Sequence, residues 1–308
     1  MRASRAPALT DKTLLVLRLI LALLVLALLV LAPLLLLPFS TSYAQEFVPN
    51  TTHADTALVS TLAPMMENTR NPLLEISTSE GEIYLELFAD AAPNSVRRVL
   101  ELANQQYYDG LVFHRVVPAS FLQTGAVERA GRLRATAIAD EINARGLGLE
   151  QQPLLDSSGK PHPWLNIRDT ADFQQRVLVP LYRNMNISNS EQLAARQEQV
   201  VQRLQQMNLL QLHEFTGYRY NGSLPSRRPL SGSVMLANRG PGSNDGELLL
   251  SLQDTPWLTG THTVIGRIVS SLSLASSISR QPESSVRVYS IRQLDTSLAP
   301  LTTTQPGA

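Results

Sequence analysis

The sequence predicts a mainly β protein, and two patterns support that prediction. Apolar and polar residues alternate over residues 74–78 and again over residues 83–87. Further strand-like runs follow near the end of the chain, over residues 233–237, 247–252, 262–269 and 286–291. Turns rich in Gly, Pro and Asn separate these runs. Many short strands with few helices between them indicate a closed or sandwiched all-β core.

The bulk composition allows such a domain and excludes several classes of function. A chain of 308 residues, 44% of them apolar, has enough material for a hydrophobic core. Because its 26 basic and 26 acidic residues balance, no net charge attracts a polyanion, and we expect no nucleic-acid partner. The absence of cysteine excludes disulfides and cysteine-rich zinc sites. No two histidines have metal-ligand spacing, so we expect no metal and no cofactor.

The N-terminal segment has the pattern of a bacterial export signal. Basic residues precede an uncharged apolar run over residues 19–39, and small residues at Ser42 and Ala44 follow it. This order predicts a signal peptide over residues 1–44, cleaved after Ala44, and a periplasmic protein. The apolar run is also close to the length that spans a bilayer. The alternative is therefore an inner-membrane anchor through residues 19–39, with the body facing the periplasm.

The remaining chain divides into a linker, a folded body and a tail. Residues 45–71 are rich in Thr, Asn and Pro without a sustained period, which predicts a linker or N-terminal arm. The body is expected over residues 72–295, followed by a disordered tail over residues 296–308. It opens with a β-hairpin formed by the two alternating runs. A short amphipathic helix follows from Pro93, and residues 111–117 form a strand interrupted by two polar side chains.

Helical patterns interrupt the β body over about residues 142–228, which predicts a helical insertion. Residues 169–185 have helical spacing, although Pro180 should kink or break that helix. Ser188 and Glu191 form an S-x-x-E capping box, and the apolar stripe that follows ends at Gly217. The simpler interpretation is that this stripe packs on neighbouring helices. The alternative is a groove for client proteins or a dimer contact.

Three ordered motifs resemble those of a known family. Residues 111–118 read L-V-F-H-R-V-V-P and are followed by F-L-Q-T-G at residues 121–125. The other two are S-V-M-L-A-N-R-G-P-G-S-N at residues 233–244 and T-P-W-L-T-G-T-H-T-V-I-G at residues 255–266. They resemble the F-H-R-V-I-P-x-F-M-x-Q-G-G, L-S-M-A-N-x-G-P-x-T-N and P-W-L-D-G-K-H-T-V-F-G runs of cyclophilins. The resemblance implies a closed cyclophilin-like antiparallel β-barrel with flanking helices and a helical insertion.

Cyclophilins are one class of peptidyl-prolyl cis-trans isomerase, so the resemblance also implies an activity. The reaction is rotation about an X–Pro amide bond, with a barrier of about 18–20 kcal/mol, and it requires no covalent intermediate. By resemblance Arg115 is catalytic, since its permanently charged fork of donors can stabilise the twisted amide. Gln123 would lie on the same face, accept from Arg115 and donate to a substrate carbonyl. The expected partners are proline-containing unfolded or extended polypeptides, among them exported proteins that are folding.

The resemblance further implies a set of substrate-binding residues. Asn238 and the backbone at Ala237 would bind the extended peptide, and His262 would contact a substrate carbonyl. The wall of the proline pocket would consist of apolar side chains, namely Phe113, Phe121, Leu249, Trp257 and Leu258. Without the motifs, Arg115 could instead pair with Glu128 or Glu141, and His262 would be an ordinary partly buried histidine.

The chain departs from the family pattern in the predicted pocket. Ser120 and Leu249 stand where the family has aromatic residues, Phe121 replaces methionine, and Glu247 replaces glutamine. The loss of two rings removes about 1–3 kcal/mol of proline binding. An alternative function is therefore a weakly active or inactive cyclophilin-like module that binds peptides as a chaperone. A third hypothesis makes the helical insertion an adaptor that docks the domain onto a membrane complex.

Overall fold

The computed structural model describes residues 51–295. The predicted signal peptide over residues 1–44 and the predicted tail over residues 296–308 lie outside the described residues. No helix in the described part combines the length and the apolar character that crossing a bilayer requires.

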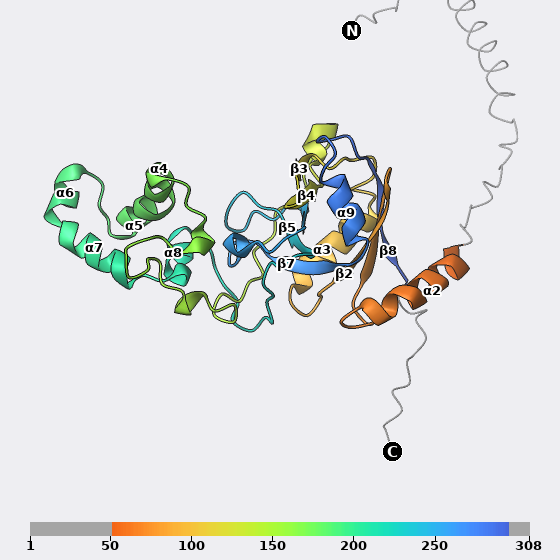
Figure 1. The fold of residues 1–308 in the computed structure, drawn as a ribbon, viewed down its shortest axis with the longest axis horizontal. Coiled ribbons are helices and arrows are strands. Elements are labelled where there is room, and N and C mark those ends of the chain that lie inside the picture. The colour runs from red at the N-terminus through yellow and green to blue at the C-terminus, as the bar shows by residue number, and fades with distance from the viewer. Residues whose placement is uncertain (1–50, 296–308) are drawn as a thin grey trace, which may run out of the picture. The chain divides into compact units, whose positions relative to one another are not determined.

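The described residues contain one antiparallel sheet of eight strands, which curls around a hydrophobic core (Figure 1). Its order is β3-β4-β6-β5-β7-β2-β1-β8. The strands are β1 (Leu73–Thr78), β2 (Gly81–Leu87), β3 (Arg115–Val117), β4 (Phe121–Thr124), β5 (Ser233–Leu236), β6 (Leu248–Ser251), β7 (Val264–Ser270) and β8 (Val288–Leu294). The prediction of a mainly β core is confirmed.

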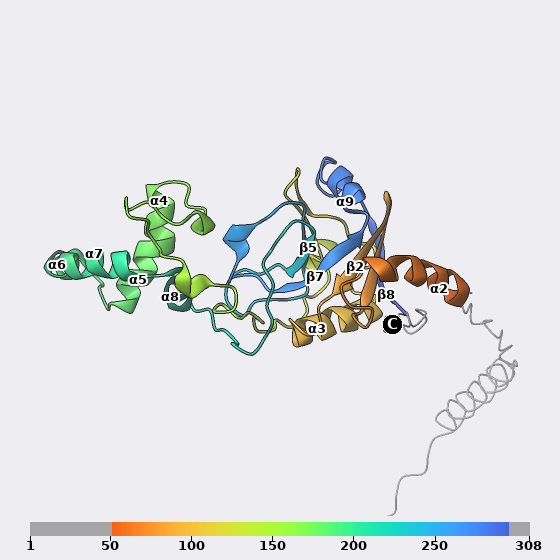
Figure 2. The same cartoon turned by 60° about the horizontal axis from the view of Figure 1, so that its bottom comes forward.

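The hairpin and the helix predicted at the start of the body are both present. In the hairpin β1–β2, Leu74 lies opposite Leu85 and Ile76 opposite Ile83, and all four side chains are fully buried. The helix α3 (Pro93–Asn104) buries Val96 and other apolar residues against the same core. A second helix, α9 (Leu272–Ile278), also contributes to this core, and Figure 2 shows α3 and α9 at opposite ends of the curled sheet.

The closed barrel that the sequence predicts is not shown, because the edge strands β3 and β8 are not joined by a strand ladder among the described residues. The backbone just before β3 instead meets the start of β8. Val288 N donates to Leu111 O over 2.8 Å, and Phe113 N donates to Val286 O over 3.2 Å. An isolated bridge links Val112 with Arg287. The sheet is therefore a curled sheet whose two edges are connected by a few irregular hydrogen bonds.

The predicted linker contains a helix, α2 (Thr51–Leu62), which the sequence pattern did not predict. Val59 and Leu62 are buried with Leu73, Val269 and Leu294, a small cluster beside the sheet. The helix has no extended apolar stripe, and its packing partners are distant in sequence. Local periodicity therefore gave no signal for it. A short 3-10 turn (Ala63–Met65) follows it.

Five α-helices lie between β4 and β5 in the chain and have a hydrophobic cluster of their own. They are α4 (Thr170–Phe173), α5 (Val179–Asn184), α6 (Ser190–Ala195), α7 (Gln197–Gln206) and α8 (Leu209–Phe215). Fully buried residues such as Leu149, Leu181 and Leu209 belong to this cluster. The apolar stripe of the sequence therefore packs internally, as the simpler interpretation predicted.

Pro180 interrupts the predicted helix in a specific way. A π-helical segment, Gln174–Leu178, separates α4 from α5, and Pro180 stands in the first turn of α5. Proline has no backbone N–H and cannot complete the regular ladder there. A local π turn accommodates the missing donor while the helical path continues.

The predicted capping box at Ser188 and Glu191 is wrong by one residue. Asn189 is the N-cap of α6, and its side chain accepts from Gln192 N over 2.8 Å. Gln192 in turn accepts from Ser188 N over 2.9 Å. Asn and Ser are similarly favourable at the N-cap, so the S-x-x-E spacing alone could not show that Asn189 and not Ser188 caps the helix.

Candidate functional site

The strand register places Arg115 and Gln123 side by side on the face of the sheet that lies away from the main core. Arg115 is the direct partner of Gln123 in the β3–β4 pair, and Gln123 is the partner of Leu249 in the β4–β6 pair. Side chains alternate between faces along a strand, while direct cross-strand partners share one face. Leu122 and Leu248, which belong to the opposite face, are fully buried in the main core. The motif residues therefore form a row across the outer face.

A small apolar cluster, here called the outer-face cluster, lies beside this row. Its buried members are Phe88, Ala91, Met235, Ala237, Leu249 and Val264, with Phe121 and Leu258 packed partly buried against them. Ala237, Leu249, Phe121 and Leu258 were all predicted to bind substrate. The other members were not predicted, because Met235 and Val264 resemble ordinary strand residues and Phe88 and Ala91 come from the segment between β2 and α3. The cluster is the apolar surface available to hold a proline ring.

Arg115 projects from β3 over this surface. It is exposed, and its Cζ lies 4.7 Å from the centroid of the Phe121 ring, within cation–π range. Among the residues that the structure describes, it has no ion pair. Glu128 pairs instead with Arg134 and Arg239, and Glu141 accepts from Asn94 and Ser95. The alternative in which Arg115 serves a structural salt bridge to either carboxylate is therefore not realised.

Gln123 has a different partner from the one predicted. Its Nε2 donates over 2.6 Å to Glu247, a residue just before β6. Glu247 also accepts from Arg239 over 2.7 Å, and His114 Nε2 lies 3.5 Å from it. Burial alone would raise the pKa of Glu247, but hydrogen bonds from His114 and Gln123 and the charge of Arg239 lower it overall. The group is a carboxylate at neutral pH.

Asn238 supports the loop that follows β5. Its side-chain amide donates to Thr261 O over 2.8 Å, and its Oδ1 accepts from Gly240 N over 3.2 Å. The backbone of Ala237 donates to Glu247 O over 2.9 Å. Asn238 thus ties this loop to residue 261, which directly precedes the predicted substrate contact His262. The structure brings both predicted segments together, with the Asn238 amide engaged inside the protein.

The residues of the third motif are partly buried around a 3-10 turn, Pro256–Leu258. Leu258 packs on the outer-face cluster, whereas Trp257 is partly buried in the same turn without joining it. His262 Nδ1 lies 3.1 Å from Thr261 Oγ1. Burial lowers the pKa of His262 to about 4, so the imidazole is neutral at neutral pH.

Phe113 does not line this site. It is fully buried in the main core, on the other side of the sheet from the outer-face cluster. The sequence predicted an unbroken strand over residues 111–117, but only Arg115–Val117 form a strand. The resemblance predicted Phe113 in the wall of the pocket, but the backbone before Arg115 is irregular and the Phe113 side chain lies in the main core.

Ser120, which stands where the family has an aromatic residue, is hydrogen-bonded inside the protein. It is nearly buried, and its Oγ accepts from Gln253 Nε2 over 2.9 Å. Phe121 packs against the outer-face cluster, so its ring restores part of the lost apolar surface.

Two partly buried histidines predict a loss of stability in mild acid. Burial lowers the pKa of both His213 and His262 from 6.5 to about 4. Between these values the unfolded chain binds more protons than the native protein, so stability is complete above pH 6.5 and falls as the pH drops towards 4. Chemical denaturation at several pH values measures this slope. His262→Asn and His213→Asn should each flatten it, and a slope unchanged in both variants would contradict the assignment.

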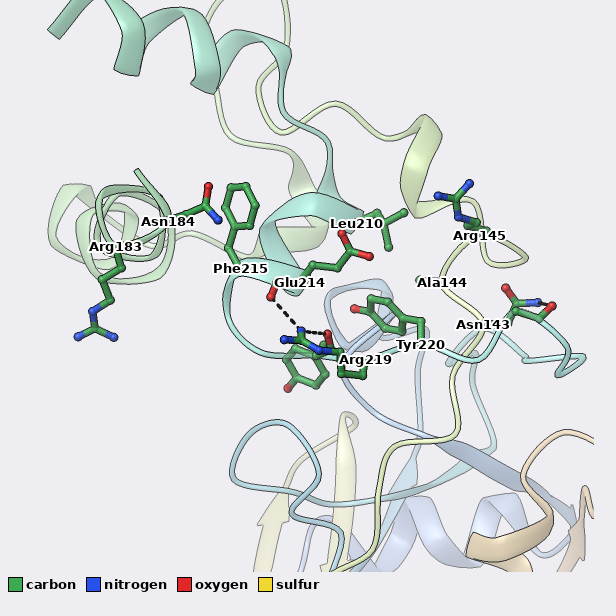
Figure 3. A pocket seen from close by; sticks show the side chains of 12 residues that line it. Asn143, Ala144, Arg145, Arg183, Asn184, Leu210, Glu214, Phe215, Arg219 and Tyr220 are labelled. Carbon is green, nitrogen blue, oxygen red and sulfur yellow. Dashed lines mark hydrogen bonds between the residues drawn. The ribbon is translucent and has the colours of Figure 1, made fainter. Parts of the chain in front are cut away.

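A cavity of the described residues lies elsewhere. About 800 Å³ in volume, it is lined by side chains of α5 and α8 and of residues 143–145 and 218–222 (Figure 3). In its centre, Arg219 donates to the carbonyls of Glu214 and Tyr218 over 3.4 and 2.8 Å. Its lining includes three arginines and one glutamate, unlike an apolar slot for a proline ring. No predicted site residue lines it.

Comparison with known proteins identifies a family. The family model for cyclophilin type peptidyl-prolyl cis-trans isomerases matches residues 73–295, more than half of the chain. The chain is similar to peptidyl-prolyl cis-trans isomerase ppi1 of Schizosaccharomyces pombe, with 24% identity over 65% of this chain and 81% of the relative.

Two solved structures are also similar. The cyclophilin AquaCyp293 from Hirschia baltica has 19% identity, covers 76% of this chain and 77% of its own, and gives a TM-score of 0.44. A cyclophilin type isomerase from Cryptosporidium parvum, crystallised in the presence of the dipeptide Ala-Pro, has 14% identity, covers 71% and 97%, and gives 0.41. The assignment rests on the family model and on the order of the motifs along the strands. The chain belongs to the family of cyclophilin type peptidyl-prolyl cis-trans isomerases.

Proposed function

We propose that the outer face of β3, β4 and β6 catalyses rotation about X–Pro amide bonds in unfolded or extended polypeptides. The observation that carries this proposal is the exposed guanidinium of Arg115, which forms no ion pair with a carboxylate of residues 51–295 and lies 4.7 Å from the Phe121 ring beside the outer-face cluster. An arginine held in this way can form new hydrogen bonds to a substrate without first breaking an ion pair.

The chemistry requires no proton transfer and no nucleophile. When the amide twists, its resonance is lost and the nitrogen lone pair becomes a better hydrogen-bond acceptor. In our proposal the outer-face cluster holds the proline ring, and Arg115 donates to the twisted amide. Because this donation is stronger at the transition state than in either planar isomer, it lowers the barrier in both directions.

The test is the rate of cis–trans exchange of a short X–Pro peptide, measured by NMR exchange spectroscopy with a catalytic amount of the protein. We expect exchange to accelerate above the uncatalysed timescale of tens to hundreds of seconds. Line broadening of the peptide without faster exchange would instead support the alternative function, a peptide-binding module. That alternative is favoured by Ser120 and Leu249, which stand where the family carries aromatic rings.

We further propose that the protein acts on exported proteins in the periplasm. The support is the basic, apolar and small-residue order of residues 1–44, ahead of a domain at residues 72–295 that carries a helical insertion at about residues 142–228. N-terminal sequencing of the protein from the periplasmic fraction should begin at Gln45. Recovery of the intact chain in the membrane fraction would favour the anchored alternative.

A further inference from the structure

Glu247 lies at the centre of a polar network beside Gln123. Its side chain is 8% exposed, yet its two oxygens accept from Gln123 over 2.6 Å and from Arg239 over 2.7 Å. Arg239 in turn donates to Asp245 over 2.7 Å. His114 Nε2 completes the set, 3.5 Å from Glu247. A buried carboxylate with this many donors is fixed in position.

The strand order places Gln123 between Glu247 and Arg115. On one side of β4 lies β3, where Arg115 is the direct partner of Gln123. On the other side lies β6, where Leu249 is the partner, and Glu247 precedes Leu249 by two residues. A carboxylate, a primary amide and a guanidinium therefore follow one another across the outer face.

This order determines which end of the amide faces which neighbour. A carboxylate only accepts, so the Gln123 group that it binds must be the NH₂. The carbonyl Oε1 diverges from that NH₂ and is left for a donor on the other side, where Arg115 is the direct strand partner of Gln123. With glutamine at position 247, the two amides could exchange donor and acceptor roles, and the orientation of Gln123 would be ambiguous.

We propose that Glu247 is a positioning residue for the isomerase reaction, which holds the Gln123 amide with its oxygen towards Arg115. The inference rests on the proposed function. It replaces the expectation that Gln123 chiefly donates to the substrate, since one of its donors is already taken. Glu247 acts through Gln123 and does not touch the substrate.

A double-mutant cycle tests this coupling. Glu247→Met removes the acceptor, and we expect kcat/KM for a short X–Pro peptide to fall about 10-fold, mainly in kcat, because the proline-binding surface is unchanged. In a Gln123→Ala background the same substitution should change kcat/KM less than about 2-fold. Glu247→Gln keeps an acceptor but adds a donor, so the Gln123 amide can bind in either orientation, and we expect a loss between those of the unmodified protein and Glu247→Met. The matched control is Glu101→Met, on the exposed face of α3.

Two outcomes would overturn the proposal: an equal loss from Glu247→Met in both backgrounds, or no loss in either. A measurement on the unmodified protein does not depend on activity or on the stability of a variant. The side-chain amide protons of Gln123 should be separated in the NMR spectrum, one of them shifted downfield by the carboxylate. If both have the shifts of an exposed glutamine, the positioning role is wrong even if the protein is an active isomerase.

Discussion

Replacement of Arg115 by alanine is expected to lower kcat/KM for an X–Pro peptide by about 10²–10³-fold, with little change in the melting temperature. This is the usual cost of removing one preorganised donor from a transition state. Stability should be nearly unchanged because Arg115 is exposed and its described contact is the Phe121 ring. The measurements are the exchange rate of the peptide and the thermal unfolding of both proteins.

Two further variants serve as a control and as a test of whether the planar guanidinium or only its positive charge is needed. Arg280→Ala removes an exposed arginine just after α9 and should leave the rate unchanged. Arg115→Lys keeps the positive charge but loses the planar fork, so most of the loss should persist. If Arg115→Ala retains the full rate, catalysis does not occur at this guanidinium.

Replacement of Glu86 by alanine should have the largest effect on stability, a loss of about 3–5 kcal/mol. The Glu86 side chain is completely buried on β2. It accepts from Glu67 N and Asn68 N over 2.9 and 3.0 Å, and from Asn71 and Arg267 over 2.8 and 3.0 Å. Its removal leaves these donors without their acceptor and releases the segment that connects α2 to β1.

Thermal unfolding measures this effect, and the melting temperature should fall by roughly 6–20 °C. Glu101→Ala is the matched control, because that carboxylate forms only exposed ion pairs with Arg97 and Arg98 and should change stability little. Equal melting temperatures for the two variants would show that the Glu86 network does not stabilise the fold.

The sequence predicted those parts of the molecule in which local pattern and tertiary packing agree. The hairpin β1–β2 and the helix α3 were correct because each buries one face, which leaves a clear period in the sequence. The helix α2 was missed because the residues that pack on the small cluster beside the sheet, Leu58, Val59 and Leu62, are too few to leave a helical period in the sequence. The two edges of the curled sheet are connected by a few hydrogen bonds between distant backbone segments, for which the side-chain pattern carries no information.

The predicted site shows the same division. The motif positions Arg115, Gln123 and Leu249 lie in one row, because strand register follows from hydrophobic alternation. The prediction that Phe113 lines the pocket is wrong, because its side chain lies in the main core where the strand is irregular. Phe88 was not predicted, because it joins the outer-face cluster from another part of the chain. To predict the hydrogen bond between Gln123 and Glu247, both the β4–β6 register and the path of the loop after β5 would have to be known.

Peptide-induced shift changes in the methyl and aromatic NMR spectra test the location of the site most directly. On titration with an X–Pro peptide, the account predicts that the changes centre on Phe121, Leu249 and Leu258 of the outer-face cluster. Changes confined to Tyr218 and Tyr220, in the cavity beside α8, would contradict it.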